Sequence, residues 1–153
     1  MNTSHMARPS YNPIVTKALV LALAITASIE MCAGTASQPA LTVKQIMNVL
    51  VTPTTSKIWG AADLKTDTEW LQVEHAALGV MAAGNLLSSG GAGPGETELA
   101  AQADWQTFNN RMIAAARQIL EAVAAKDEEA LFAVGNNALY PPCESCHQKY
   151  QKR

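Results

Sequence analysis

The 153-residue chain contains few of the residues that most often carry out chemistry. It has three cysteines, at positions 32, 143 and 146, and only three histidines. Its net charge is −2, so no basic surface for nucleic acid is indicated. No nucleophile stands with a base in a pattern that would predict an enzyme. We also find no convincing strand pattern and no internal repeat. One short segment therefore holds most of the functional information.

That segment is Cys143-Glu144-Ser145-Cys146-His147, close to the C-terminus. On a helix, the two thiols and the imidazole stand at positions i, i+3 and i+4 and share one face. The pattern predicts covalent attachment of one c-type haem, with His147 able to reach the iron. A thioredoxin-type redox pair would instead require a βαβ pattern, and a structural zinc site would require four clustered ligands. The sequence meets neither requirement.

Residues 1–36 have the order of a secretory signal peptide. Arg8 and Lys17 precede an apolar run over 18–27. This run is shorter than the roughly 20 residues that a spanning helix needs. The small residues Gly34-Thr35-Ala36 offer a cleavage site before Ser37, and cleavage between Gly34 and Thr35 is the alternative. We therefore expect export to the periplasm, with no stable membrane span after the signal is removed.

Cys32 lies within this segment and raises the alternative of a lipid anchor. Glu30 and Met31 stand where a lipoprotein signal has small residues, so we disfavour that interpretation. Export also suits the haem hypothesis. Paired cysteines can meet haem outside the reducing cytosol, where free thiols are otherwise prone to oxidation.

Residues 37–153 suffice for one domain, and their apolar spacing predicts four helices. Thr42 and Gln45 have the spacing of a capping box at the start of the first helix. Pro53 should kink or end this helix because its ring clashes with the preceding turn and lacks an N–H. Alternatively, Thr52 caps a fresh helix that continues beyond Pro53.

The second helix is predicted to start at another capping box, formed by Thr66 and Glu69. Its apolar residues recur at alternating spacings of three and four, which is the seam expected in a helix bundle. These residues are Trp70, Val73, Ala77, Val80, Gly84 and Leu87. The glycine-rich segment 88–95 is expected to be a connector, because glycine and proline are unfavourable within helices.

The third helix repeats the seam, and Asp127 is expected to cap the fourth, where Glu128 and Glu129 complement the helix dipole. The third seam comprises Trp105, Phe108, Met112, Ala115, Ile119 and Ala122; the fourth comprises Leu131, Val134, Ala138 and Leu139. A break is predicted near Tyr140, with a short new helix started by Pro142, because residues that precede proline disfavour the α conformation.

Four amphipathic helices with Cys-x-x-Cys-His near the end of the last one resemble the class II c-type cytochromes, the family of cytochrome c prime and its low-spin relatives. The similarity in organisation covers residues from about 41 to 153. At the level of individual residues, it rests on 143–147 and Tyr150. The resemblance implies an all-α, antiparallel four-helix bundle. It also implies covalent attachment of haem c through Cys143 and Cys146, with His147 as the proximal iron ligand.

The resemblance also implies that the first helix supplies the distal contact to the haem. Met47 lies on the inward face of that helix and is the candidate distal ligand, with plain packing as the alternative. Tyr150 is placed to pack on the haem side. Met81 and Met112 are expected to fill the core, and the heptad position of His75 predicts that it faces solvent. Any one of the three tryptophans, Trp59, Trp70 and Trp105, could line the pocket.

Two functions follow from these residues. The first is an electron carrier in which Met47 completes the iron coordination, and the alternative is a five-coordinate haem protein that binds nitric oxide or carbon monoxide. The basic residues Lys149, Lys152 and Arg153 are expected to form a solvated terminus, with a docking patch for an acidic redox partner as the alternative. An exposed seam between two helices would support a homodimer. We expect neither an enzymatic activity nor a nucleic-acid partner.

Overall fold

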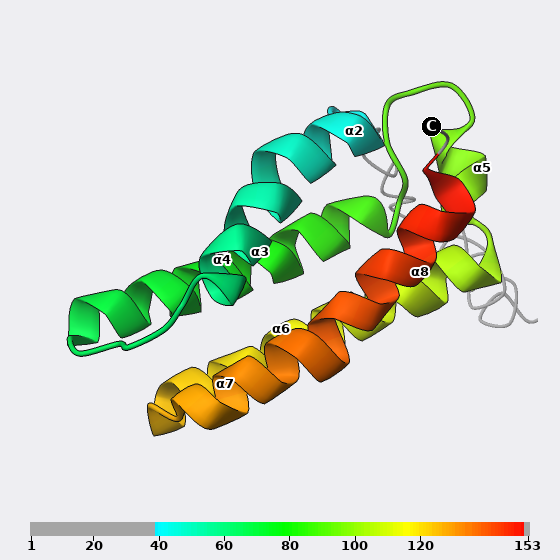
Figure 1. The fold of residues 1–153 in the computed structure, drawn as a ribbon. Helices are drawn as coiled ribbons and strands as arrows, with labels where there is room; N and C mark the ends of the chain where they lie inside the picture. The colour runs from blue at the N-terminus through cyan, green and yellow to red at the C-terminus, as the bar shows by residue number, and fades with distance from the viewer. Residues whose placement is uncertain (1–38, 152–153) are drawn as a thin grey trace, which may run out of the picture. The chain divides into compact units, whose positions relative to one another are not determined.

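The computed structural model describes residues 39–151, and every regular element in this part of the chain is a helix (Figure 1). The elements are α2 (Val43–Ile46), η1 (Met47–Val51), α3 (Thr52–Trp59), α4 (Asp67–Leu87), α5 (Glu96–Ala100), α6 (Ala103–Ala125), α7 (Glu128–Val134), η2 (Gly135–Leu139) and α8 (Tyr140–Tyr150). Elements η1 and η2 are π-helical turns. The all-α class predicted from the sequence is confirmed for residues 39–151. The expected signal segment, residues 1–36, lies outside them.

The helices form four long stretches, because α2, η1 and α3 follow one another without interruption, as do α7, η2 and α8. Helix α4 packs against α3 and α6, and α6 packs in turn against α7, η2 and α8. Helix α6 lies side by side with the last stretch (Figure 1). The largest fully buried side chains come from all four stretches: Ile46, Val73, Val80, Ile119 and Leu139.

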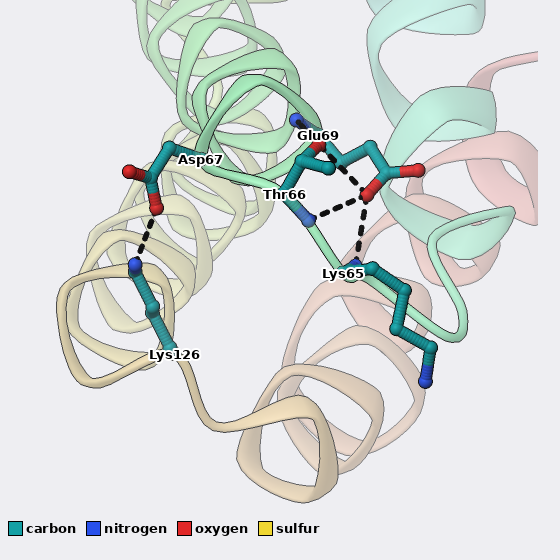
Figure 2. Close-up of polar contacts among 5 residues, drawn as sticks. All are labelled: Lys65, Thr66, Asp67, Glu69 and Lys126. Carbon is teal, nitrogen blue, oxygen red and sulfur yellow. Dashed lines mark hydrogen bonds and ion pairs between the residues drawn. The ribbon is translucent and has the colours of Figure 1, made fainter.

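The helix caps predicted at Thr42, Thr66 and Asp127 are confirmed. Thr42 caps α2, with its side chain accepting a hydrogen bond from the Gln45 N–H, and Gln45 reaches back to the Thr42 N–H. Thr66 and Glu69 form the same capping box at the start of α4 (Figure 2). Asp127 caps α7 through a hydrogen bond from the Ala130 N–H at 2.9 Å.

The seam predicted for α4 is buried at all six positions. Gly84 lies at a close approach of α4 to α6, since a Cβ added to it would lie 2.4 Å from Cγ1 of Ile113. The seam of α6 is also buried, except for Phe108, which is half-buried. Figure 2 shows an additional surface link between these two helices, an ion pair between Asp67 and Lys126. Apolar periodicity thus correctly indicates which faces of α4 and α6 meet.

Pro53 does not end the first helical stretch, which continues through it, and Thr52 does not cap a fresh helix there, because the start of α3 has no side-chain cap. Thr52 has helical φ and ψ angles of −58° and −51°, and its N–H bonds to the carbonyl of Met47, five residues back. In a regular α-helix, the proline ring would clash with the carbonyl four residues earlier. Because the π-turn η1 bonds five residues back, the turn in front of the ring is wider and the chain stays helical.

The break predicted near Tyr140 is wrong for the same reason. Tyr140 is helical, with φ −63° and ψ −47°, and its N–H bonds to the carbonyl of Gly135, again five residues back. The π-turn η2 therefore accommodates Pro141 and Pro142 inside a helix that continues through the Cys-x-x-Cys-His motif. Both π-turns end two residues before a proline, at Val51 and at Leu139.

The glycine-rich connector after α4 is confirmed, but it is followed by the unpredicted helix α5. Gly90 has a φ of +83°, and a Cβ there would lie 2.2 Å from the carbonyl oxygen of Glu96. The carboxylate of Glu96 accepts hydrogen bonds from the N–H groups of Val43 and Gly93. The connector is therefore folded back against the first residues of α2.

Candidate functional site

Helix α8 presents the Cys-x-x-Cys-His motif in the predicted arrangement. Cys143 and Cys146 are half-buried and pack against the hydrophobic core, while His147 is exposed. The Sγ of Cys143 donates a hydrogen bond to the carbonyl oxygen of Leu139 at 3.2 Å, which is a contact across one turn of the helix. Because η2 keeps this segment helical in spite of its prolines, the three side chains emerge from one continuous helical stretch.

A cleft of about 1170 Å³ lies in front of the motif. Ligand and cofactor pockets commonly have volumes of roughly 300–1,000 Å³, so this one can accept a large planar group. Its walls come from the first and last helical stretches, and α6 contributes further lining residues. All five site residues predicted from the sequence line this cleft: Met47, Cys143, Cys146, His147 and Tyr150.

Met47 enters the cleft from η1, on a different helical stretch from the motif. It is half-buried and packs against the core. Met112, from α6, also lines the cleft and is buried, whereas the half-buried Met81 is not among the lining residues. Met112 is therefore buried in the core, as expected, and its side chain also borders the candidate site.

The environment of the two thiols favours their protonated form. Burial raises the pKa of Cys143 from 9.0 to about 11, and the nearby Cys146 thiol adds to this rise. Burial also raises the pKa of Cys146. Redox-active cysteines of the thioredoxin type instead have lowered pKa values near positive charge or at helix N-termini. The pair is thus poorly suited to thiol–disulfide exchange.

Tyr150 is held at the end of the cleft by three contacts. Its hydroxyl donates to Oε1 of Gln102 at 3.0 Å. Its ring packs edge-on against the buried Trp105, with 5.3 Å between the centroids. The ammonium of Lys149 lies 5.5 Å from the ring centroid and forms an ion pair with Asp104, which raises the pKa of Lys149. The other two residues of the basic cluster, Lys152 and Arg153, lie outside the described residues.

Of the three tryptophans, Trp59 and Trp105 line the cleft and Trp70 does not. Trp105 is buried, and its indole N–H bonds to the carbonyl oxygen of Leu87 at 2.8 Å. The indole N–H of Trp59 reaches the carbonyl oxygen of Gly135 at 3.1 Å. The sequence did not single out Trp59, because this contact spans 76 residues and no local spacing signals it.

His75 is exposed on α4 and does not line the cleft, in agreement with its heptad position. Within residues 39–151, no three His, Cys, Asp or Glu side chains form a group that could hold a metal ion. None of the described helices has the length and apolar character needed to cross a membrane. Cys32, the residue considered for lipid attachment, lies outside the described residues.

Comparisons of the chain with protein-family models, with curated proteins and with solved structures found no match.

Proposed function

We propose that this chain is an exported c-type cytochrome of the class II kind, in which an antiparallel four-helix bundle carries one covalently attached haem and transfers electrons. The observation that supports this most directly is the cleft. It gathers Cys143, Cys146, His147, Tyr150 and Met47, which come from two helical stretches far apart in the sequence.

The residues of the cleft suit a haem in size and in chemistry. The cleft is large, and several of its lining side chains are aromatic or apolar: Val51, Trp59, Leu87, Leu99, Trp105 and Phe108. A porphyrin is planar and mostly apolar, so such walls favour its burial. A zinc site would require about four protein donors on one ion, whereas an axially ligated haem requires only one or two.

The cysteines would hold the group covalently. Each thiol would add across a vinyl double bond, so that its sulfur forms a C–S bond and its proton ends on the neighbouring carbon. Nothing leaves, and no external oxidant is consumed. His147, one residue after Cys146, would bind the iron through one ring nitrogen, and Tyr150 would pack against the same group.

The bound haem supplies reversible one-electron transfer between the ferric and ferrous states of its iron. In the electron-carrier proposal, the thioether of Met47 would bind the iron in addition to His147, since both residues line the cleft. Histidine–methionine ligation raises the reduction potential relative to other ligand pairs. The protein would exchange electrons with a redox partner protein in the periplasm. We propose neither an enzymatic activity nor a nucleic-acid partner for this chain, which could also act as a homodimer.

Gas binding is the alternative function of the same site. Met47 is half-buried and packs against the core, so it can serve as a packing residue without binding the iron. If Met47 does not bind the iron, the distal position would be open to nitric oxide or carbon monoxide.

Covalent attachment can be tested on protein produced in a host that has haem-attachment machinery. The denatured chain should keep its haem colour through a gel, give a pyridine haemochrome spectrum and show the mass of one added haem. The double variant Cys143→Ala, Cys146→Ala should lose the colour, while the single variant Cys32→Ala should keep it. Colour that washes away from the wild-type chain in denaturant would rule out the covalent haem.

A further inference from the structure

Trp59 links the two helical stretches that form the walls of the cleft. It is the last residue of α3, and its Nε1 donates to the carbonyl oxygen of Gly135 in η2 at 3.1 Å. Among the hydrogen bonds of residues 39–151, no other joins the stretch 43–59 to the stretch 128–151. Trp59 also lines the cleft itself. This hydrogen bond therefore connects the two helical stretches that form the walls of the cleft.

The carbonyl that Trp59 binds also takes part in the π-turn. The Gly135 oxygen also accepts the N–H of Tyr140, the five-residue bond by which η2 accommodates Pro141 and Pro142. A second donor on this oxygen helps to keep it in the π arrangement. A change from π to α bonding shifts the helix by one residue, and each residue turns an α-helix by about 100°. The register of η2 therefore determines where the side chains after Pro142 point.

Core packing alone does not account for the position of the Trp59 side chain. Its side chain is 44 % exposed, so much of the indole lies outside the core. Its ring meets Tyr140 edge-on, with 6.4 Å between the centroids, and Tyr140 is itself 49 % exposed. The contact with Tyr140 and the bond to Gly135 together orient an indole that is only partly covered by the core.

We infer that Trp59 is a positioning residue for the haem site. By holding Gly135, it keeps η2 in its π register and so fixes how Cys143, Cys146 and His147 face Met47 across the cleft. This inference rests on the proposed haem function, and it adds a residue that lies outside the Cys-x-x-Cys-His motif.

The test uses the haem-loaded protein and two variants of Trp59. Trp59→Phe removes the indole N–H along with part of the ring system, and replacement by benzothienylalanine removes the N–H while keeping the shape. Tyr140→Phe is the control, because it retains the ring that Trp59 contacts. For each protein, we would record the ferric spectrum and the rate at which carbon monoxide binds the ferrous form after flash photolysis.

Both Trp59 variants should bind carbon monoxide roughly two- to tenfold faster, the range that corresponds to the loss of one hydrogen bond. The binding rate should rise whether carbon monoxide displaces Met47 or enters an open site, because a loosened wall admits the gas more easily. The ferric absorption bands of both variants should shift in the same direction relative to the wild-type protein. Tyr140→Phe should match the wild-type protein in both measurements.

The outcomes separate the inference from the function on which it rests. A wild-type protein without covalent haem would overturn the proposed function, and the role of Trp59 with it. A haem-loaded protein whose rate and spectrum are unchanged in the benzothienylalanine variant would overturn the positioning role alone. A change in Trp59→Phe without one in the isosteric variant would also overturn it, because ring volume rather than the hydrogen bond would then be responsible.

Discussion

The carboxylate of Glu96 accepts a hydrogen bond from the backbone N–H of Val43 at 3.0 Å, across 53 residues of sequence. The same oxygen accepts the N–H of Gly93 at 2.9 Å. Val43 is the first residue of α2, whose free N–H groups need acceptors outside the helix. Glu96 thus joins the connector after α4 to the start of the stretch that carries Met47.

Replacing Glu96 with alanine should therefore destabilise the protein. Glu96→Ala leaves two N–H groups without their charged acceptor, and we expect the free energy of unfolding to fall by roughly 1–3 kcal/mol. Glu98 is exposed on the same short helix, so Glu98→Ala should have a much smaller effect. Denaturant unfolding of the two variants measures the difference. Equal losses would mean that the bonds to Val43 and Gly93 contribute nothing to stability.

Removal of the cap at the start of α4 should also lower the free energy of unfolding by a measurable amount. The Thr66 hydroxyl accepts the N–H of Glu69 at 3.3 Å (Figure 2). Loss of such a cap typically costs about 1 kcal/mol, which is what we expect for Thr66→Ala in thermal or denaturant unfolding. Thr68→Ala changes the same residue type two positions later, at an exposed site inside the helix, and should have little effect. If Thr68→Ala were the more harmful change, the capping assignment would be wrong.

The raised pKa values of the thiols predict a pH-dependent reactivity in the haem-free chain. With a pKa of about 11 in place of 9.0, Cys143 has about a hundredfold less thiolate near pH 8 when folded than when unfolded. Alkylation of Cys143, followed by peptide mass spectrometry, should be slower in the native chain by about that factor. The rate should rise about tenfold per pH unit below pH 11. Equal rates in native and denatured chains would contradict the burial of Cys143.

The same shift affects the stability of the haem-free chain. Because the pKa of Cys143 is higher in the folded state than in the unfolded state, the folded chain retains a proton that the unfolded chain has released. Its contribution to stability is complete below pH 9 and is lost as the pH rises toward about 11. Urea midpoints measured over this interval should therefore fall. Cys143→Ser, which has no group titrating in this range, should show a smaller decrease.

The features that the sequence predicted correctly depend on local signals. The capping boxes at Thr42 and Thr66 act within four residues, and the α4 seam follows the helical period, so both can be recognised without tertiary information. The positions of Cys143, Cys146 and His147 on one helix follow from their spacing in the same way. The exposed position of His75 follows from the heptad.

The features that were missed depend on distant contacts. The rule that proline ends a helix assumes α-type hydrogen bonds, and both π-turns avoid the clash by bonding five residues back. Trp59 and Gly135 are 76 residues apart, and helix α5 has only five residues. The cleft itself could not be predicted in detail, because it depends on the way the first and last stretches stand beside α6.

The two described histidines provide a matched pair for the proximal ligand. His147 lines the cleft, while His75 is exposed on α4 and is not among the lining residues. His147→Ala should alter the visible spectrum of the haem-loaded protein and lower its yield, since the iron loses its proximal ligand. His75→Ala should leave both nearly unchanged. A similar spectral loss in the two variants would show that the iron is bound differently from our proposal.

Met47 determines which of the two functions the site performs. If its thioether binds the iron, the wild-type protein should be low-spin and show the methionine–iron charge-transfer band in its ferric spectrum. Met47→Ala should remove this band, lower the reduction potential and open the ferrous iron to rapid carbon monoxide binding. Spectra and potentiometric titrations of the wild-type and variant proteins measure these changes.

Met81→Ala is the control for this experiment, because Met81 packs against the core from α4 and is not among the residues that line the cleft. It should leave the spectrum and the potential almost unchanged, even if it lowers stability. A wild-type protein that is already high-spin and binds carbon monoxide rapidly would show that Met47 is a packing residue. The helix that carries Met47 would then only border an open iron site, and gas binding would replace electron transfer as the proposed function.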